Sequence, residues 1–177
     1  AYRIVDERSP YPLHIGVTEA GTVGRGKVKS AAGIGALLLC GIGDTMRVSL
    51  TADPVEEVIF AKELLAATGI RKDRIEIVSC PTCGRTEVDL QVIAGEIERR
   101  VELLQDRGVR DLKIAVMGCA VNGPGEAKGA DIGVACGKGK GVIFAGGSIL
   151  KTVSEEEIAD EIIKLAEEYE KNTGRID

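Results

Sequence analysis

The chain has 177 residues, of which 44% are hydrophobic and 29% are charged, proportions typical of a globular protein rather than a disordered or fibrous one. Its net charge of −5 and its few aromatic residues argue against a basic, aromatic-rich surface, so we expect no nucleic-acid partner. No apolar run approaches the roughly 20 residues that cross a bilayer, and residues 1–10 show no signal-peptide pattern, so we expect a cytoplasmic protein with no membrane partner.

The N-terminal part of the chain alternates predicted strands and helices. Short apolar runs are followed by segments with helical apolar spacing, which predicts strand, helix, strand and helix over residues 13–18, 27–40, 44–50 and 51–69. Asp53 can cap the second helix, and Pro54 occupies its first helical position. Two such units cannot close a barrel or bury both faces of a sheet, so we interpret this part as a piece of a larger domain.

A charged stretch at residues 71–74 is interpreted as a domain boundary. Beyond it the pattern predicts strand, helix, four strands and a final helix, over residues 75–79, 88–105, 112–117, 131–135, 141–145, 148–153 and 154–172. Ser154 and Glu157 form a capping-box pattern at the start of that final helix. The second domain is therefore expected to be an α+β domain.

Three cysteines stand directly after two of these predicted strands. Cys80 and Cys83 form a C-x2-C pattern, and Cys119 follows the next strand along the chain. The chain has five cysteines, an odd number that favours metal ligation or free thiols over a disulfide framework. Thiolates are soft ligands that suit iron-sulfur clusters or zinc. The spacing alone leaves open a thioredoxin-like redox pair or a structural zinc site with an unseen fourth ligand.

Glu126 stands in the glycine-rich loop that follows Cys119. No histidine lies nearby to complete a zinc site, because the single histidine, His14, belongs to the other domain. A carboxylate is a harder and more exchangeable ligand than a thiolate, so three sulfurs with Glu126 could leave one iron open to a substrate oxygen. The ordinary alternative for a glutamate in a loop is a solvated carboxylate.

Long motifs then identify a family. SCPTCGRTEVDL at 79–90, VMGCAVNGPGEAKGADIG at 116–133 and GKGKGVIF at 137–144 resemble 4-hydroxy-3-methylbut-2-enyl diphosphate synthases of the methylerythritol phosphate pathway of isoprene biosynthesis. LHIGVTEAGT at 13–22 and GIGDTMRVSLTADPVEEV at 41–58 resemble the same family, so the likeness covers almost the whole chain.

The resemblance implies a fold class. Residues 1–71 would be the last two βα units of a (β/α)8 (TIM) barrel that binds the substrate. Residues 72–177 would be an α+β [4Fe-4S] domain resembling half of a sulfite or nitrite reductase. About six earlier βα units of the barrel would then stand outside this chain.

The resemblance also implies the site residues. The cluster ligands would be Cys80, Cys83, Cys119 and Glu126, with Glu126 also catalytic as the exchangeable position. Glu19 would serve in proton transfer, and Arg47 with Ser49 would bind the diphosphate, a role that suits the planar fork of arginine. Cys40 and Cys136 stand where the family would have other residues, so we expect them to be free thiols in apolar or tight positions, apart from the ligands.

The implied activity is that of an iron-sulfur oxidoreductase. It would open the ring of 2-C-methyl-D-erythritol 2,4-cyclodiphosphate and remove its hydroxyl, giving 4-hydroxy-3-methylbut-2-enyl diphosphate, with electrons from a ferredoxin or flavodoxin. The family implies a head-to-tail homodimer. We expect the chain to be part of a larger enzyme and to be inactive alone; the alternatives are an electron-carrying or structural iron-sulfur module and a zinc-binding domain.

Overall fold

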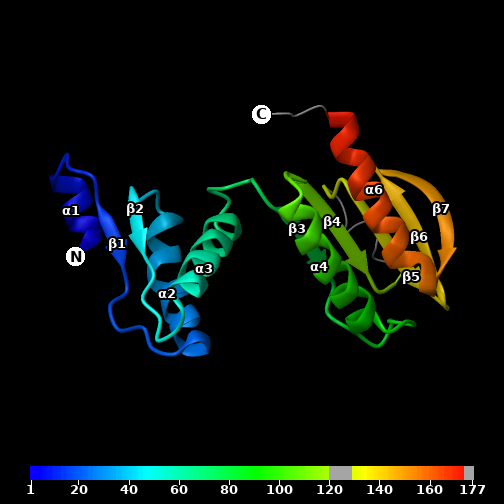
Figure 1. The fold of residues 1–177 in the computed structure, drawn as a ribbon, viewed down its shortest axis with the longest axis horizontal. Coiled ribbons are helices and arrows are strands. Elements are labelled where there is room, and N and C mark those ends of the chain that lie inside the picture. The colour runs from blue at the N-terminus through cyan, green and yellow to red at the C-terminus, as the bar shows by residue number, and fades with distance from the viewer. Residues whose placement is uncertain (120–128, 174–177) are drawn as a thin grey trace. The chain divides into compact units, whose positions relative to one another are not determined.

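The computed structural model describes residues 1–119 and 129–173. The chain divides into two compact units, Ala1–Lys72 and Asp73–Asp177 (Figure 1). None of the helices in the described part combines the length and apolar character that a membrane span requires.

The first unit contains two parallel strands and the helices that follow them. Strands β1 (His14–Gly16) and β2 (Thr45–Arg47) pair in register, so that Gly16 lies opposite Arg47. Helices α2 (Val23–Leu38) and α3 (Pro54–Ala67) pack against each other, and α2 also contacts β1. The predicted order of elements is confirmed. Each strand is three residues long, shorter than predicted.

The start of α3 follows the capping rules that predicted it. The Asp53 carboxylate accepts a hydrogen bond from the Val55 N–H at 2.8 Å, and Pro54 occupies the first turn. The Glu57 carboxylate in the same turn accepts from the Leu50 N–H at 2.7 Å, which fastens the loop after β2 to the helix. Beneath these helices lies a small core made of Ile15, Ile34, Leu38, Val48, Phe60 and Leu64.

A short helix, α1 (Tyr2–Arg8), precedes β1 and was not predicted from the sequence. It buries none of its residues, and therefore carries no periodic apolar face by which a sequence reveals a helix. Tyr2 attaches it to the unit, because its hydroxyl donates to the His14 carbonyl oxygen at 3.0 Å and its ring packs against the core.

The second unit is built on one five-stranded sheet with the order β3-β4-β5-β6-β7. The first three strands are parallel, and the last two join by antiparallel hairpins. The strands are β3 (Ile75–Ser79), β4 (Leu112–Met117), β5 (Ile132–Gly137), β6 (Lys140–Ala145) and β7 (Ser148–Ser154). This agrees with the predicted order of elements.

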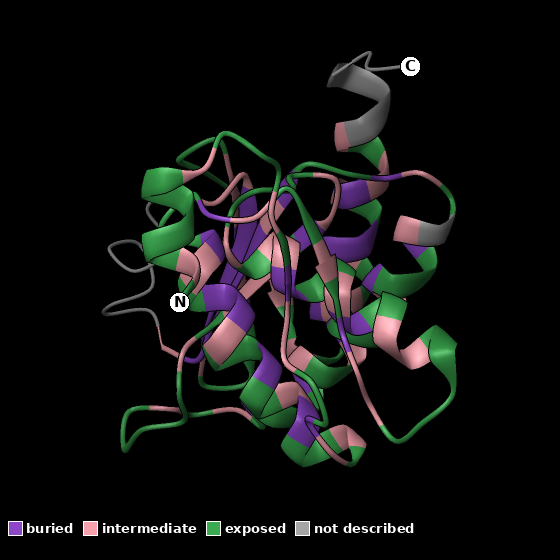
Figure 2. Cartoon of the chain, turned by 90° about the vertical axis from the view of Figure 1, so that its left-hand side faces the viewer, coloured by how far each residue is buried: buried purple, intermediate pink, exposed green. Residues whose placement is uncertain are grey.

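Helices α4 (Leu90–Asp106) and α6 (Ile158–Thr173) cover one face of this sheet (Figure 1). α4 contacts β3 and β4, α6 contacts β5 and β6, and the two helices contact each other. The predicted capping box is present: Ser154 and Glu157 bond reciprocally around a short 3-10 turn, Glu155–Glu157, that leads into α6. Buried residues lie on the inward sides of the strands and helices (Figure 2), and the largest are Ile97, Leu112, Ile114, Ile132, Ile143, Ile158 and Ile162.

The opposite face of the sheet has a smaller apolar cluster. Ala115 and Met117 are buried there, and the Phe144 ring packs beside them. The ring lies over Gly133, where a Cβ atom would collide with it and would stand 2.6 Å from the Ala115 carbonyl oxygen. Glycine at this position therefore leaves space for the Phe144 ring to pack close to the sheet.

Replacing Gly133 with alanine is expected to lower the free energy of unfolding by about 1–3 kcal/mol, because the new Cβ would meet backbone that cannot move aside. Gly95 is the matched control. It is exposed on α4 with nothing within 4 Å of its Cβ position, and alanine there is expected to raise that free energy by up to about 1 kcal/mol. Urea unfolding measures both changes; a Gly133→Ala variant as stable as the parent chain would contradict this account of the sheet.

Candidate functional site

Two of the cysteine positions follow neighbouring strands in the second unit. β3 and β4 are parallel and adjacent, with Ser79 opposite Val116, so their carboxyl ends lie at the same edge of the sheet. Cys80 comes directly after β3, and its N–H donates to the Val116 carbonyl oxygen at 3.3 Å. Cys119 comes two residues after the end of β4. Both loops thus begin at one edge of the sheet.

A backbone hydrogen bond reaches the Cys80 sulfur. The Gly118 N–H donates to Cys80 Sγ at 3.2 Å, which joins the loop after β3 to the loop after β4. Cys80 is partly buried and packs against the apolar clusters on both faces of the sheet. Hydrogen bonds to sulfur stabilise thiolates and adjust the potential of iron-sulfur centres, so the sulfur is in an environment suited to a ligand.

Thr86 connects the same two loops. Its hydroxyl oxygen accepts from the Cys83 N–H at 3.2 Å, and its own N–H donates to the Cys83 carbonyl oxygen at 3.0 Å. A Cβ at Gly118 would stand 3.0 Å from Thr86 and from Leu90, so Thr86 lies closely over the glycine that bonds Cys80. Sequence reasoning did not select Thr86, because a threonine in a loop carries no signal until its neighbours in space are known.

The three expected cysteine ligands, all of them described, do not form a group that could hold a metal ion. Among the residues that the structure describes, no three His, Cys, Asp or Glu side chains lie together closely enough to hold a metal ion. Cys83 is exposed, whereas Cys80 and Cys119 are partly buried. Glu126 falls within residues 120–128, outside the described residues. The donor chemistry of three cysteine sulfurs on two joined loops fits an iron-sulfur cluster.

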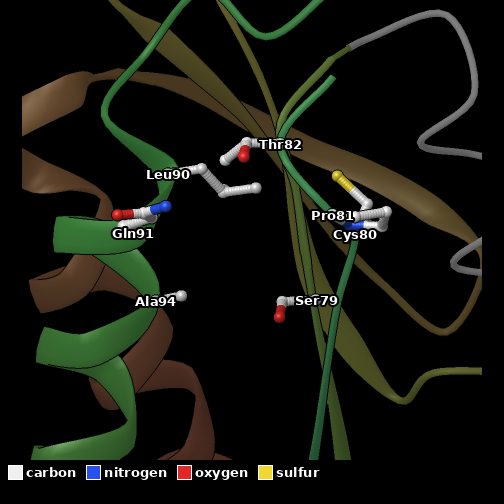
Figure 3. Close-up of a pocket in the computed structure, with 7 residues that line it drawn as sticks. All are labelled: Ser79, Cys80, Pro81, Thr82, Leu90, Gln91 and Ala94. Carbon is white, nitrogen blue, oxygen red and sulfur yellow. The ribbon is translucent and has the colours of Figure 1, made fainter.

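A pocket of about 300 Å³ lies beside Cys80. Figure 3 shows strand-end residues on one side and residues of α4 on the other; the pocket is lined by Ser79, Cys80, Pro81, Thr82, Leu90, Gln91 and Ala94. The lining combines apolar groups with two hydroxyls and an amide. The pocket thus lies at the edge of the sheet where the loop after β3 begins.

The two remaining cysteines differ from each other. Cys136 is fully buried in β5, as expected, and burial, followed by the charges of Glu155 and Cys80, raises the pKa of its thiol to about 12. Cys40 was expected in an apolar or tight position, but it is exposed two residues after the end of α2, where its sulfur accepts a hydrogen bond from Arg3 at 3.1 Å.

The predicted site residues of the first unit stand near the carboxyl ends of β1 and β2. Arg47 is the last residue of β2, Ser49 follows two positions later, and Glu19 lies three positions after β1. Glu19 is exposed and has a φ of 54°, a left-handed conformation that is uncommon outside glycine. The Arg47 guanidinium donates to the Thr18 hydroxyl oxygen at 2.9 Å.

Comparison with known proteins gives two family matches. The model described as "GcpE protein C-terminal domain" matches residues 76–168, and the model described as "GcpE TIM-barrel domain" matches residues 1–62. Together they cover parts of both units.

Curated relatives carry one name, "4-hydroxy-3-methylbut-2-en-1-yl diphosphate synthase (flavodoxin)". The protein of Clostridium perfringens is 57% identical over 94% of this chain and 47% of its own length. The Clostridium acetobutylicum protein is 56% identical over 93% of this chain and 46% of its own length. The Caldanaerobacter subterraneus protein is 53% identical over 97% of this chain and 47% of its own length. The chain thus spans about half the length of these relatives.

Alkylation should distinguish Cys136 from Cys40. At pH 8 iodoacetamide is expected to modify Cys40 in the native chain and to leave Cys136 intact, because burial removes access and a pKa raised from 9.0 to about 12 cuts the thiolate fraction about 1,000-fold. Mass spectrometry of tryptic peptides measures both, with urea-unfolded chain as the control in which Cys136 reacts.

The raised pKa of Cys136 also predicts the direction in which the free energy of unfolding changes with pH. The buried neutral thiol contributes its full share of the free energy of unfolding below pH 9. That contribution is lost as the pH rises toward 12, because the Cys136 thiol ionises at a lower pH in the unfolded chain than in the folded chain. Cys136→Ala should therefore weaken the dependence of the free energy of unfolding on pH between 9.0 and about 12. In the alkylation experiment, equal labelling of Cys136 and Cys40 in the native chain would contradict the buried position of Cys136.

Proposed function

This chain belongs to the GcpE family, and from that premise we propose that it forms part of a larger 4-hydroxy-3-methylbut-2-enyl diphosphate synthase. The proposed reaction is the reductive ring opening and dehydroxylation of 2-C-methyl-D-erythritol 2,4-cyclodiphosphate in isoprenoid biosynthesis. The name shared by the relatives supports both the activity and flavodoxin as the electron donor, with ferredoxin as the alternative donor.

The observation that carries the proposal is the joined pair of cysteine loops. Cys80 and Cys119 follow adjacent parallel strands, and the Gly118 N–H donates to Cys80 Sγ at 3.2 Å. We assign Cys80, Cys83, Cys119 and Glu126 as the residues that would hold a [4Fe-4S] cluster. When bound, such a cluster supplies electrons one at a time. Because thiols persist in reducing compartments, free cysteines also favour a cytoplasmic location.

The first unit would provide the substrate-binding residues. Arg47 can bind a phosphate through two parallel N–H donors, and Ser49 can donate its hydroxyl to the same group. Glu19, exposed in the loop after the neighbouring strand β1, would hold or accept a proton at its carboxylate. These residues follow the carboxyl ends of parallel strands, the end at which barrel enzymes place their sites.

The same family membership supports the architecture. The first unit would be the last two βα units of a (β/α)8 barrel, and the second a cluster domain like half of a sulfite or nitrite reductase. The assembly would be a head-to-tail homodimer. The chain alone is expected to be inactive, because productive binding requires the diphosphate to be held to within about an ångström.

Metal and sulfide analysis tests the cofactor assignment. Chain purified without oxygen is expected to contain about four iron and four sulfide per chain, and Cys80→Ser, Cys83→Ser and Cys119→Ser should each lose most of both. Cys40→Ser is the matched control and should retain them, because Cys40 lies in the other unit. Zinc without sulfide, or full retention in all three variants, would contradict the ligand set.

Glu126 can be tested as the exchangeable ligand. In the larger enzyme, Glu126→Cys is expected to retain the cluster and to abolish turnover, because a fourth thiolate does not give way as a carboxylate does. Iron content and the rate of product formation measure the two effects separately, with Glu126→Asp as the variant that preserves the carboxylate. Full turnover by the Glu126→Cys variant would contradict a catalytic role for Glu126.

A further inference from the structure

One face of the β1–β2 pair is polar. Ile15 and Met46, which pair with each other, pack into the apolar core under the helices. Residues on either side of them point to the opposite face, since side chains alternate along a strand. On that face His14 Nδ1 lies 2.8 Å from the Thr45 hydroxyl oxygen, and Gly16 stands opposite Arg47. This polar face lies on the side away from the helices.

Gly16 leaves room for the Arg47 side chain. A Cβ at Gly16 would stand 2.9 Å from the Arg47 carbonyl oxygen and 3.5 Å from Arg47 Cβ, so any side chain there would press on Arg47. With that position empty, the guanidinium reaches across β1 to the residue two positions further along. Its Nη2 donates to the Thr18 hydroxyl oxygen at 2.9 Å.

The partner that orients Arg47 is neutral. Other arginines of the chain bond carboxylates, such as Arg99 with Glu96 at 2.8 Å and Arg100 with Asp160 at 2.6 Å. Among the described residues, no ion-pair partner of Arg47 lies within bonding distance. A hydroxyl uses one of the five guanidinium donors and leaves the charge and the remaining donors for an anion.

We infer that Thr18 is a positioning residue: its hydroxyl holds the Arg47 guanidinium beside the carboxyl end of β1, pre-oriented for a phosphate of the substrate. This inference rests on the proposed function, in which Arg47 binds the diphosphate. A side chain fixed in place before binding loses less conformational entropy when the ligand arrives. Thr18 therefore acts on substrate affinity through Arg47.

The test uses the larger enzyme and the cyclic diphosphate as substrate. Thr18→Val, which keeps the shape but removes the oxygen, is expected to raise KM about 5- to 10-fold with a smaller change in kcat, and Thr18→Ser should restore KM. Thr45→Val is the matched control. It removes the other threonine hydroxyl of this face, which bonds His14 instead, and should leave KM within about twofold of the parent value.

A double-mutant comparison distinguishes the positioning role of Thr18 from the substrate-binding role of Arg47. In an Arg47→Met background, Thr18→Val should produce no further rise in KM, because there is no guanidinium left to orient. If Arg47→Met leaves KM unchanged, the substrate role of Arg47 in the proposed function fails. If Arg47→Met raises KM while Thr18→Val does not, or if Thr18→Val acts equally in both backgrounds, the positioning role alone is overturned.

A measurement on the 177-residue chain guards against misfolded variants. Nitrogen relaxation of the Arg47 Nε–H group should show greater side-chain motion in Thr18→Val than in the parent or in Thr45→Val. The backbone spectrum serves as the check that each variant is folded. Unchanged Arg47 motion in a folded Thr18→Val variant would contradict the inference directly.

Discussion

β3 and β4 pair in parallel from Ile75 and Leu112 to Ser79 and Val116, and this ladder determines where the two cysteine loops begin. The pairing continues one step beyond the strands, through the hydrogen bond from the Cys80 N–H to Val116 and the bond from Gly118 to the Cys80 sulfur. Residues 38 positions apart in the sequence, Cys80 and Gly118, are thereby joined. The proposed cluster chemistry depends on this alignment of strands.

The sequence predicted elements where local rules decide the structure. β3 and β4 are predicted at their observed bounds, and the caps at Asp53 and Ser154 form as the sequence patterns indicate. The helix α1 could not be predicted because it buries no side chain. The exposure of Cys40 was also missed, since apolar neighbours in sequence do not determine which side of a helix end faces solvent.

The candidate sites were predictable by residue type and motif but not by contact. Chemistry and spacing indicate Cys80, and the family resemblance indicates Arg47. The residues that hold them, Gly118 and Thr18, come from loops that meet only in the folded chain. Both supporting contacts follow a common arrangement. A neutral donor or acceptor orients a functional group without neutralising it, which leaves the thiolate or the guanidinium available for a ligand.

Mössbauer spectroscopy of the ⁵⁷Fe-labelled chain, prepared without oxygen, tests the central claim most directly. A [4Fe-4S] cluster held by three cysteines and Glu126 predicts cluster-type signals in which about one quarter of the iron differs from the rest, because one iron has an oxygen ligand in place of sulfur. Replacing Glu126 with cysteine should remove that difference. Spectra without any cluster iron, or with four equivalent irons in the unaltered chain, would contradict the assignment.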